Sequence, residues 1–304
     1  MNNRLVLLAA LLLPAAALAD EPTTDAAPDA DLIVNGQPEP GFDAVVALGA
    51  DFGGPFSACT GTLITPRVVL TAAHCGGNLP VSLIVSIGKA FIGPDVNNAD
   101  QVFGFEDYLG HPGYEELSNG PNGTLGANDV GVGILDGDAD VETAWLNLRE
   151  LDSDDMDTEL LSVGFGITSG GGDGGGTKRS AIVTVDDLDE QFIISANNTN
   201  PNDANICSGD SGGPELFQLP DGRWEVWGVH SWGDEECLHR SGSTRVDLMQ
   251  EWILDRVEAV HGTRDLCEAN GKYDDAVCDA YCEQEDPACV IEEGDDDDSA
   301  TGGT

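Results

Sequence analysis

The sequence predicts an all-β domain. After the first 32 residues, short apolar runs alternate with breaks rich in glycine, proline, asparagine and aspartate. Runs this short with turns this frequent are typical of a β-barrel or a β-sandwich. One later segment, 247–260, has instead the spacing of a helix, with Leu248, Trp252, Ile253 and Val257 on one face. The apolar runs are 44–48, 68–72, 83–87, 130–135, 160–163, 181–185 and 224–229.

Residues 1–19 have the pattern of a signal peptide. Arg4 supplies a basic start, Leu5 to Leu13 form an apolar core, and Ala17-Leu18-Ala19 fits the small-residue cleavage rule. The alternative, a membrane anchor, needs about 20 apolar residues and would not expect the cleavage pattern. No other stretch is long and apolar enough to span a bilayer. We therefore predict a secreted protein, extracellular or periplasmic, without a membrane span.

The rest of the chain divides by composition. Residues 20–32 are acidic and contain proline, as expected for a short propeptide. A domain over 33–262 has the usual length of a single all-β barrel domain. Residues 263–290 are rich in cysteine and predict a disulfide-stapled appendage. The acidic residues 291–304 predict a disordered tail.

The charge excludes several classes of partner. The chain has 56 acidic and 12 basic residues, a formal net charge of -44. Such a charge excludes a basic surface for nucleic acid and disfavours anionic membranes. The acidic excess is compatible with calcium binding, but no complete EF-hand loop is present. We predict no metal site and no cofactor.

Three separated segments supply the residues of a nucleophilic hydrolase. A serine hydroxyl is a poor nucleophile at neutral pH, so it needs an imidazole to take its proton and a buried carboxylate to orient the imidazole. Ser211, His74 and Asp129 are the candidates for nucleophile, base and orienting acid. Their order along the chain differs from that of α/β-hydrolases, in which the serine comes first.

Glycines surround the predicted nucleophile, in Gly209-Asp210-Ser211-Gly212-Gly213-Pro214. Backbone N–H groups must come close to a developing oxyanion, and side chains would obstruct the tight turn. The N–H groups of Gly209 and Ser211 are the predicted oxyanion hole.

With these motifs the chain resembles the chymotrypsin/trypsin-like serine endopeptidases, in particular a bacterial-type secreted member. The resemblance implies two six-stranded antiparallel barrels with a C-terminal helix, a monomer, and hydrolysis of protein or peptide substrates through an acyl-enzyme. Gly164-Phe165-Gly166 departs from the usual Gly-Trp-Gly, and the family's middle-loop disulfide has no cysteines here. The segments that carry the resemblance are Ile33-Val34-Asn35-Gly36, Cys59 to Ile64, Val68 to Cys75, Asn128-Asp129-Val130, Gly209 to Pro214 and Ser231-Trp232-Gly233.

The resemblance also implies zymogen activation and two disulfides. Cleavage before Ile33 would free an amine that pairs with Asp210. Leu32 precedes this bond, so a trypsin-like activator is disfavoured and the activating protease is unknown. By the same resemblance Cys59 pairs with Cys75, and Cys207 with Cys237.

Four cysteines remain in the appendage, Cys267, Cys278, Cys282 and Cys289. They permit three disulfide connectivities, between which the sequence does not choose. Zinc is the competing interpretation because two of them are four residues apart, but export and the lack of a nearby histidine disfavour it.

The substrate pocket has a neutral residue at its predicted floor. The resemblance places Asn205 there, where tryptic specificity requires an aspartate. Asp234 and Glu235 could still meet a basic side chain at the rim. In the family, Ser231, Trp232 and Gly233 form the strand that pairs with extended substrate.

His230 precedes this strand and resembles a histidine of the glutamyl-specific branch. With Arg240 near in sequence, it indicates a pocket that could accept glutamate or aspartate. Ile206 departs from that branch, which has a small hydroxyl residue at this place. The alternatives are a packed strand histidine and a neutral pocket.

Two other functions use the same fold. A binding or adhesion protein could keep the fold without turnover, although such proteins usually lose a catalytic residue and none is lost here. An esterase would use the same catalytic residues on another substrate.

Overall fold

The computed structural model describes residues 33, 36–120, 123–168, 174–196, 204–234, 237–282 and 284–289. All of them lie in Asp31–Thr304, one of two compact units of the chain. The predicted signal peptide (1–19), propeptide (20–32) and acidic tail (291–304) lie outside the described residues. In the described part of the chain no helix is long and apolar enough to cross a membrane.

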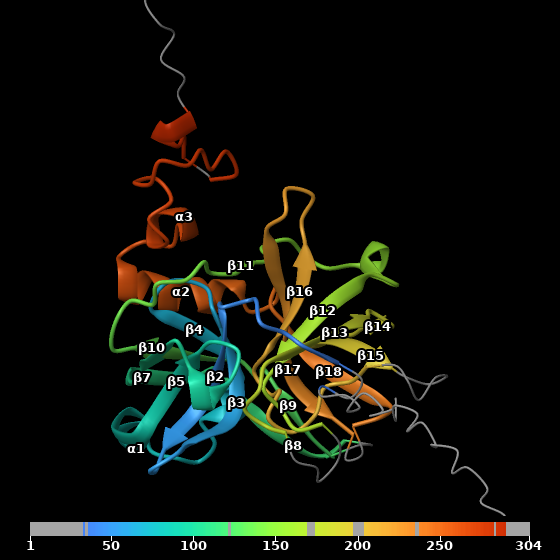
Figure 1. The fold of residues 1–304 in the computed structure, drawn as a ribbon. Coiled ribbons are helices and arrows are strands. Elements are labelled where there is room, and N and C mark those ends of the chain that lie inside the picture. The colour runs from blue at the N-terminus through green and yellow to red at the C-terminus, as the bar shows by residue number, and fades with distance from the viewer. Residues whose placement is uncertain are drawn as a thin grey trace, which may run out of the picture. The chain divides into compact units, whose positions relative to one another are not determined.

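The first sheet comes from the N-terminal half of the chain (Figure 1, blue to green). Its seven strands follow the order β6-β5-β2-β3-β4-β10-β7, and neighbouring strands are antiparallel. β4, between β3 and β10, is buried along its whole length, as its apolar residues Val68, Val69 and Leu70 favour. The strands are β2 (Val45–Asp51), β3 (Pro55–Leu63), β4 (Val68–Thr71), β5 (Gly88–Ile92), β6 (Gln101–Phe103), β7 (Phe105–Gly110) and β10 (Gly131–Leu135).

The second sheet comes mainly from the C-terminal half. The order β1-β13-β12-β16-β17-β18-β15-β14 is antiparallel, and β11 pairs with β17 in parallel. β8 (Glu115–Gly120) and β9 (Gly123–Ala127) form a separate hairpin. The strands of the sheet are β1 (Gln37–Pro38), β11 (Trp145–Leu146), β12 (Glu159–Gly164), β13 (Arg179–Thr184), β14 (Asp187–Leu188), β15 (Phe192–Ala196), β16 (Pro214–Gln218), β17 (Trp224–Gly233) and β18 (Arg240–Arg245).

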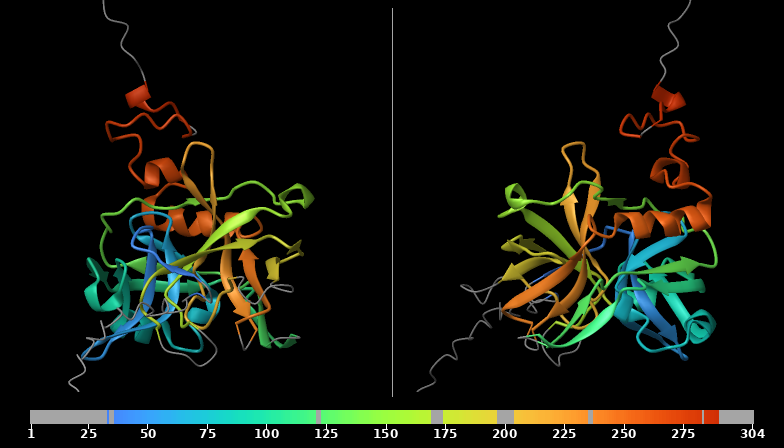
Figure 2. Two further views of the ribbon diagram at one scale, coloured as in Figure 1. Left: turned by 45° about the vertical axis from the view of Figure 1, so that its right-hand side comes forward. Right: turned by 180° about the vertical axis from the view of Figure 1, so that it is seen from behind.

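Few helices accompany the sheets. α2 (Gln250–His261) buries Ile253 and Val257 as predicted, and it packs against β4 and β10. The prediction was wrong for Leu248, which precedes the helix and is exposed. Figure 2 shows α2 beside the strands of the first sheet. Gly262, in the left-handed conformation with φ 78°, ends this helix. The other helices are α1 (Val81–Ile87), α3 (Leu266–Ala269), and the 3₁₀ turns η1 (Ala73–Cys75), η2 (Val96–Asn98), η3 (Ser153–Asp155) and η4 (Pro287–Cys289).

The all-β prediction with a C-terminal helix is confirmed by these elements, but one predicted strand was wrong. Residues 83–87 belong to α1, which has no buried residue. β5 follows immediately and pairs with β2, so the preceding segment has no strand partner and closes its hydrogen bonds within a helix.

One hydrophobic core joins the two sheets. It includes Val46 and Val132 from the first sheet, Val229 from the second, Ile253 from α2 and Leu266 from α3. Because both sheets bury residues in the same core, loops from one sheet are held against loops from the other. A smaller cluster around Trp227 lies within the second sheet.

All eight cysteines form disulfides. In the appendage, Cys267 pairs with Cys282 and Cys278 with Cys289, which selects one of the three connectivities. With no free thiolate left, these cysteines cannot hold zinc. The other two bonds, Cys59–Cys75 and Cys207–Cys237, are those that the resemblance implies.

Candidate active site

His74 and Asp129 form a hydrogen-bonded pair at the edge of the first sheet. His74 lies in η1, directly after β4, and Asp129 lies shortly before β10, the neighbour of β4. The His74 Nδ1 atom is 2.7 Å from Asp129 Oδ2, and the His74 backbone N–H donates to Oδ1 at 2.9 Å. Because the carboxylate accepts, Nδ1 carries the proton and Nε2 keeps its lone pair. His74 is therefore in the tautomer that can take a proton at Nε2.

The second sheet supplies a third donor to Asp129. Ser231, in β17, donates its hydroxyl to Oδ2 at 2.6 Å, and Asp129 is 1% exposed. A carboxylate this buried stays charged only when hydrogen bonds replace its water. Ser231, predicted only as a substrate-binding residue, thus also holds the predicted orienting acid.

Tyr108 holds the backbone on both sides of His74. Its hydroxyl donates to the Ala72 carbonyl at 2.6 Å and accepts from the Gly76 N–H at 2.9 Å. Burial raises the pKa of the Tyr108 hydroxyl, so it remains a donor at all physiological pH values. No motif in the sequence pointed to this residue.

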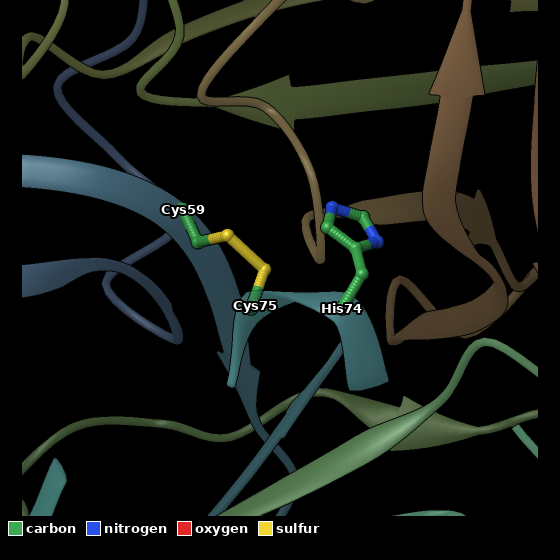
Figure 3. Close-up of side chains that lie close together, drawn as sticks. All are labelled: Cys59, His74 and Cys75. Atoms are coloured by element: carbon green, nitrogen blue, oxygen red, sulfur yellow. A yellow bond between two sulfur atoms is a disulfide. The ribbon is translucent and has the colours of Figure 1, made fainter. Parts of the chain in front are cut away.

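The Cys59–Cys75 disulfide lies beside the imidazole (Figure 3). The two sulfur atoms and a ring nitrogen of His74 lie within 4.8 Å of one another. Both sulfurs are in a disulfide, however, so neither is the thiolate that a metal needs. The disulfide instead links β3 to η1, the turn that carries His74.

Ser211 lies in a turn that only glycines can build. The Thr60 N–H from β3 donates to the Ser211 carbonyl at 2.8 Å, and the Thr60 hydroxyl donates to the Gly209 carbonyl at 2.9 Å. Gly209 and Gly212 have φ of 97° and 83°. A Cβ atom on Gly212 would come within 2.4 Å of the Thr60 carbonyl oxygen. The positive φ angles and the close contact with the first sheet therefore explain why glycine is needed at these positions, as predicted.

Asp210 is fully buried beside the predicted nucleophile. Its carboxylate accepts from the N–H groups of Cys207 at 2.9 Å and Gly166 at 2.8 Å. Burial raises the pKa of this carboxyl to about 7. A Cβ atom on Gly166 would approach the Asp210 carboxylate to 2.6 Å, which explains a glycine there. Ile33, the predicted partner of Asp210 after cleavage, is 1% exposed.

Asn205 precedes Cys207 of the Cys207–Cys237 disulfide by two residues and is 2% exposed. Its side-chain oxygen accepts from the Ile206 N–H, whereas its Nδ2 atom has no hydrogen-bond partner among the described residues. Trp232 packs edge-on against Phe192, with ring centroids 6.0 Å apart. Gly233, the third residue of the predicted substrate strand, ends β17.

His230 does not fit the interpretation as a ligand for a substrate carboxylate. The residue has no exposed surface, and both ring nitrogens contact protein groups. Burial lowers the pKa of His230 to about 4, so the ring is neutral at pH 7. His230 is therefore a buried histidine packed within a strand, which was the alternative to a substrate ligand. The physical reason is that its side chain points into the second sheet.

The carboxylate of Asp234 closes a turn. It accepts from the backbone N–H groups of Leu238, His239 and Arg240 at 2.7–3.2 Å. Glu235, the other acidic residue predicted at the rim, lies outside the described residues. Asp234 therefore stabilises this turn, whereas the tryptic alternative placed it at the rim to meet a basic side chain of the substrate.

A small cavity of about 220 Å³ flanks η1. Leu79, Ile84, Tyr108 and Tyr114 are among its lining residues, and Ala73 and Gly76 connect it with the segment of His74. Cavities of about 450 and 700 Å³ lie near Trp145, and none of the three predicted catalytic residues lines them.

The model of the trypsin family matches residues 33–253. The chain belongs to the trypsin family of serine proteases. A trypsin of Saccharopolyspora erythraea is 29% identical over 218 residues, which cover 66% of this chain and 87% of that protein. The urokinase-type plasminogen activator of Gallus gallus is 27% identical, and the match covers 66% of this chain and 51% of that protein.

The family also contains relatives described as inactive. The inactive serine protease PAMR1 of Pongo abelii is 25% identical over 239 residues, which cover 65% of this chain and 32% of that protein. The chain thus spans about half or less of two of these three relatives. Membership of the trypsin family establishes the fold, whereas activity depends on the residues of the site.

Proposed function

We propose that this protein is a secreted serine endopeptidase with His74 as general base and acid, Asp129 as orienting acid and Ser211 as nucleophile. One observation carries the proposal. Asp129 is almost completely buried, yet it accepts three hydrogen bonds, two from His74 and one from Ser231. A fold kept only for binding has no need of a buried carboxylate that fixes an imidazole tautomer.

The chemistry follows from these roles. Ser211 Oγ attacks the scissile carbonyl while His74 Nε2 takes its proton, and the N–H groups of Gly209 and Ser211 stabilise the oxyanion. His74 then gives the proton to the leaving amine, which leaves an acyl-enzyme. Water, activated by the same imidazole, hydrolyses the acyl group and restores the serine.

We propose activation by cleavage before Ile33. Asp210 is a buried carboxyl whose pKa burial raises to about 7 despite the charge of Arg179, and among the described residues two backbone N–H groups bond to its oxygens. A buried carboxylate without a cation is costly, so a new ammonium group at this place would stabilise it. The Ile33 amine freed by an unknown protease is our candidate for that cation.

We propose that the substrate residue before the scissile bond is uncharged. The predicted floor residue Asn205 carries no charge, His230 has no exposed surface, and the Asp234 carboxylate closes a turn. This disfavours both the tryptic and the acidic preference. A medium apolar side chain, or an uncharged polar one, fits these groups.

Peptide-library cleavage by the form that starts at Ile33, with a Ser211→Ala control, tests the proposal. Cleavage that is lost in the control supports an endopeptidase, and its sequence profile gives the preferred residue. Cleavage of ester but not peptide substrates would support the esterase alternative. If the correctly processed protein cleaves neither, the silent binding protein of the second alternative is the better interpretation.

A further inference from the structure

His230 contacts the segment of the predicted nucleophile at three places. Its Nδ1 atom is 3.0 Å from the Asp210 carbonyl oxygen. Its backbone carbonyl accepts from the Gly212 N–H, and its backbone N–H donates to the Gly213 carbonyl, both at 2.8 Å. A carbonyl oxygen only accepts, so Nδ1 must carry the ring proton. A Cβ atom on Gly213 would lie 2.9 Å from Nδ1, so glycine is what lets the ring approach.

The other side of the ring faces a buried polar cluster. The Ser162 hydroxyl from β12 is 2.9 Å from Nε2, and Glu215 Oε1 from β16 is 3.5 Å from Nε2. Ser243 from β18 donates to Glu215 at 3.1 Å. All four residues are at most 2% exposed. Since Nδ1 carries the proton, Nε2 accepts from Ser162, and the cluster fixes the tautomer of the ring.

Burial keeps this cluster uncharged at neutral pH. It lowers the pKa of His230 to about 4 and raises that of Glu215 to about 8. A neutral imidazole with its proton on Nδ1 donates to one carbonyl and accepts one hydroxyl, and in the structure it does both. Burial of polar side chains in a sheet interior costs free energy, so we expect such a cluster where it positions a functional segment.

We propose that His230 is a positioning residue: its Nδ1–H holds the Asp210 carbonyl and thereby fixes the turn that carries Ser211 and the oxyanion N–H groups. The inference rests on the proposed function of this site. Thr60 of the first sheet binds the Ser211 carbonyl from the other side. The turn is thus held between the two sheets, by Thr60 from one and by His230 from the other.

Three variants separate this role from mere packing. In His230→Asn the amide nitrogen can take the place of Nδ1 and keep the donor to Asp210. In His230→Gln the amide lies near the position of Nε2, so that donor is lost, and His230→Val removes both polar atoms. The measurements are the rate at which a fluorophosphonate labels Ser211, and kcat and KM for an uncharged peptide substrate.

We expect labelling and kcat to fall about 10-fold or more in His230→Gln and His230→Val, with KM changed less than about 3-fold. His230→Asn stays within about 3-fold of the wild type. Equal activity in all variants, a change confined to KM, or equal loss in the Asn and Gln variants would overturn the inference. Wild-type protein that fails to label at all would instead refute the proposed function.

A measurement on the unmutated protein covers the case in which a variant does not fold. Nitrogen-15 spectra of labelled histidine report which ring nitrogen carries the proton. We expect one histidine that keeps its proton on Nδ1 and does not titrate between about pH 5 and 8. If every histidine titrates in this range, or the buried one carries its proton on Nε2, the inference is wrong.

Discussion

Removing the Tyr108 hydroxyl tests how the backbone around His74 is held. In Tyr108→Phe the ring keeps its shape, but the Ala72 carbonyl and the Gly76 N–H each lose a short hydrogen bond. Each group keeps one longer hydrogen bond. The Ala72 carbonyl still accepts from the Cys75 N–H at 3.2 Å, and the Gly76 N–H still donates to the Ala73 carbonyl at 3.1 Å. The loss is therefore that of two ordinary hydrogen bonds, about 1–3 kcal/mol of unfolding free energy in total.

The assay is urea unfolding of the variant in an inactive Ser211→Ala background, which prevents self-digestion. Tyr114→Phe is the matched control, because the Tyr114 hydroxyl has no hydrogen-bond partner in the described part of the chain and lines the same cavity. We expect the control to lose less than about 0.5 kcal/mol. Equal losses in the two variants would refute the argument that the Tyr108 hydroxyl holds this segment.

Three further outcomes follow from the site and the appendage. In the folded, uncut protein burial raises the pKa of Asp210 to about 7, above its usual 3.8. The uncut protein therefore loses stability as pH rises toward and through 7, whereas the form that starts at Ile33 does not. Urea unfolding of both inactive forms between about pH 4.5 and 8 measures this difference. Gly212→Ala abolishes labelling by a fluorophosphonate, because φ is 83° and the new methyl group meets a backbone carbonyl at 2.4 Å; normal labelling would contradict the contact. Replacing Cys267 and Cys282 by serine lowers the unfolding free energy by about 3 kcal/mol, the value for a loop of this length, and a calorimetric Tm unchanged from wild type would show that the crosslink contributes nothing.

The appendage contributes to the core of the protein. Leu266 and Ala269 join the main hydrophobic cluster, and the Asn270 side chain bonds the Ile64 carbonyl and the Thr143 hydroxyl. Tyr281 packs edge-on against Trp145 at 4.9 Å, and the Arg223 guanidinium lies 3.7 Å from the Tyr281 ring centroid. The cysteine-rich segment is therefore anchored on the trypsin-like domain by apolar, polar and cation–π contacts.

Local sequence determined the features that depend on neighbours in the chain. Alternating short apolar runs and turns specified an all-β fold, and the apolar face around Ile253 and Val257 specified the C-terminal helix. The motifs around His74, Asp129 and Ser211 indicated the family, which the family model confirms over residues 33–253. The glycines beside Ser211 could be explained in advance because a turn close to other backbone demands them.

Only the tertiary structure decided features that depend on residues far apart in the chain. Residues 83–87 could be strand or helix until β5 took the pairing with β2. The appendage cysteines had three possible pairings until their spatial proximity selected one. His230 could face substrate or core, because a sequence does not tell which neighbours a strand side chain meets. Ser162 is 68 positions away from it, and such contacts arise only when the sheets assemble around a common core.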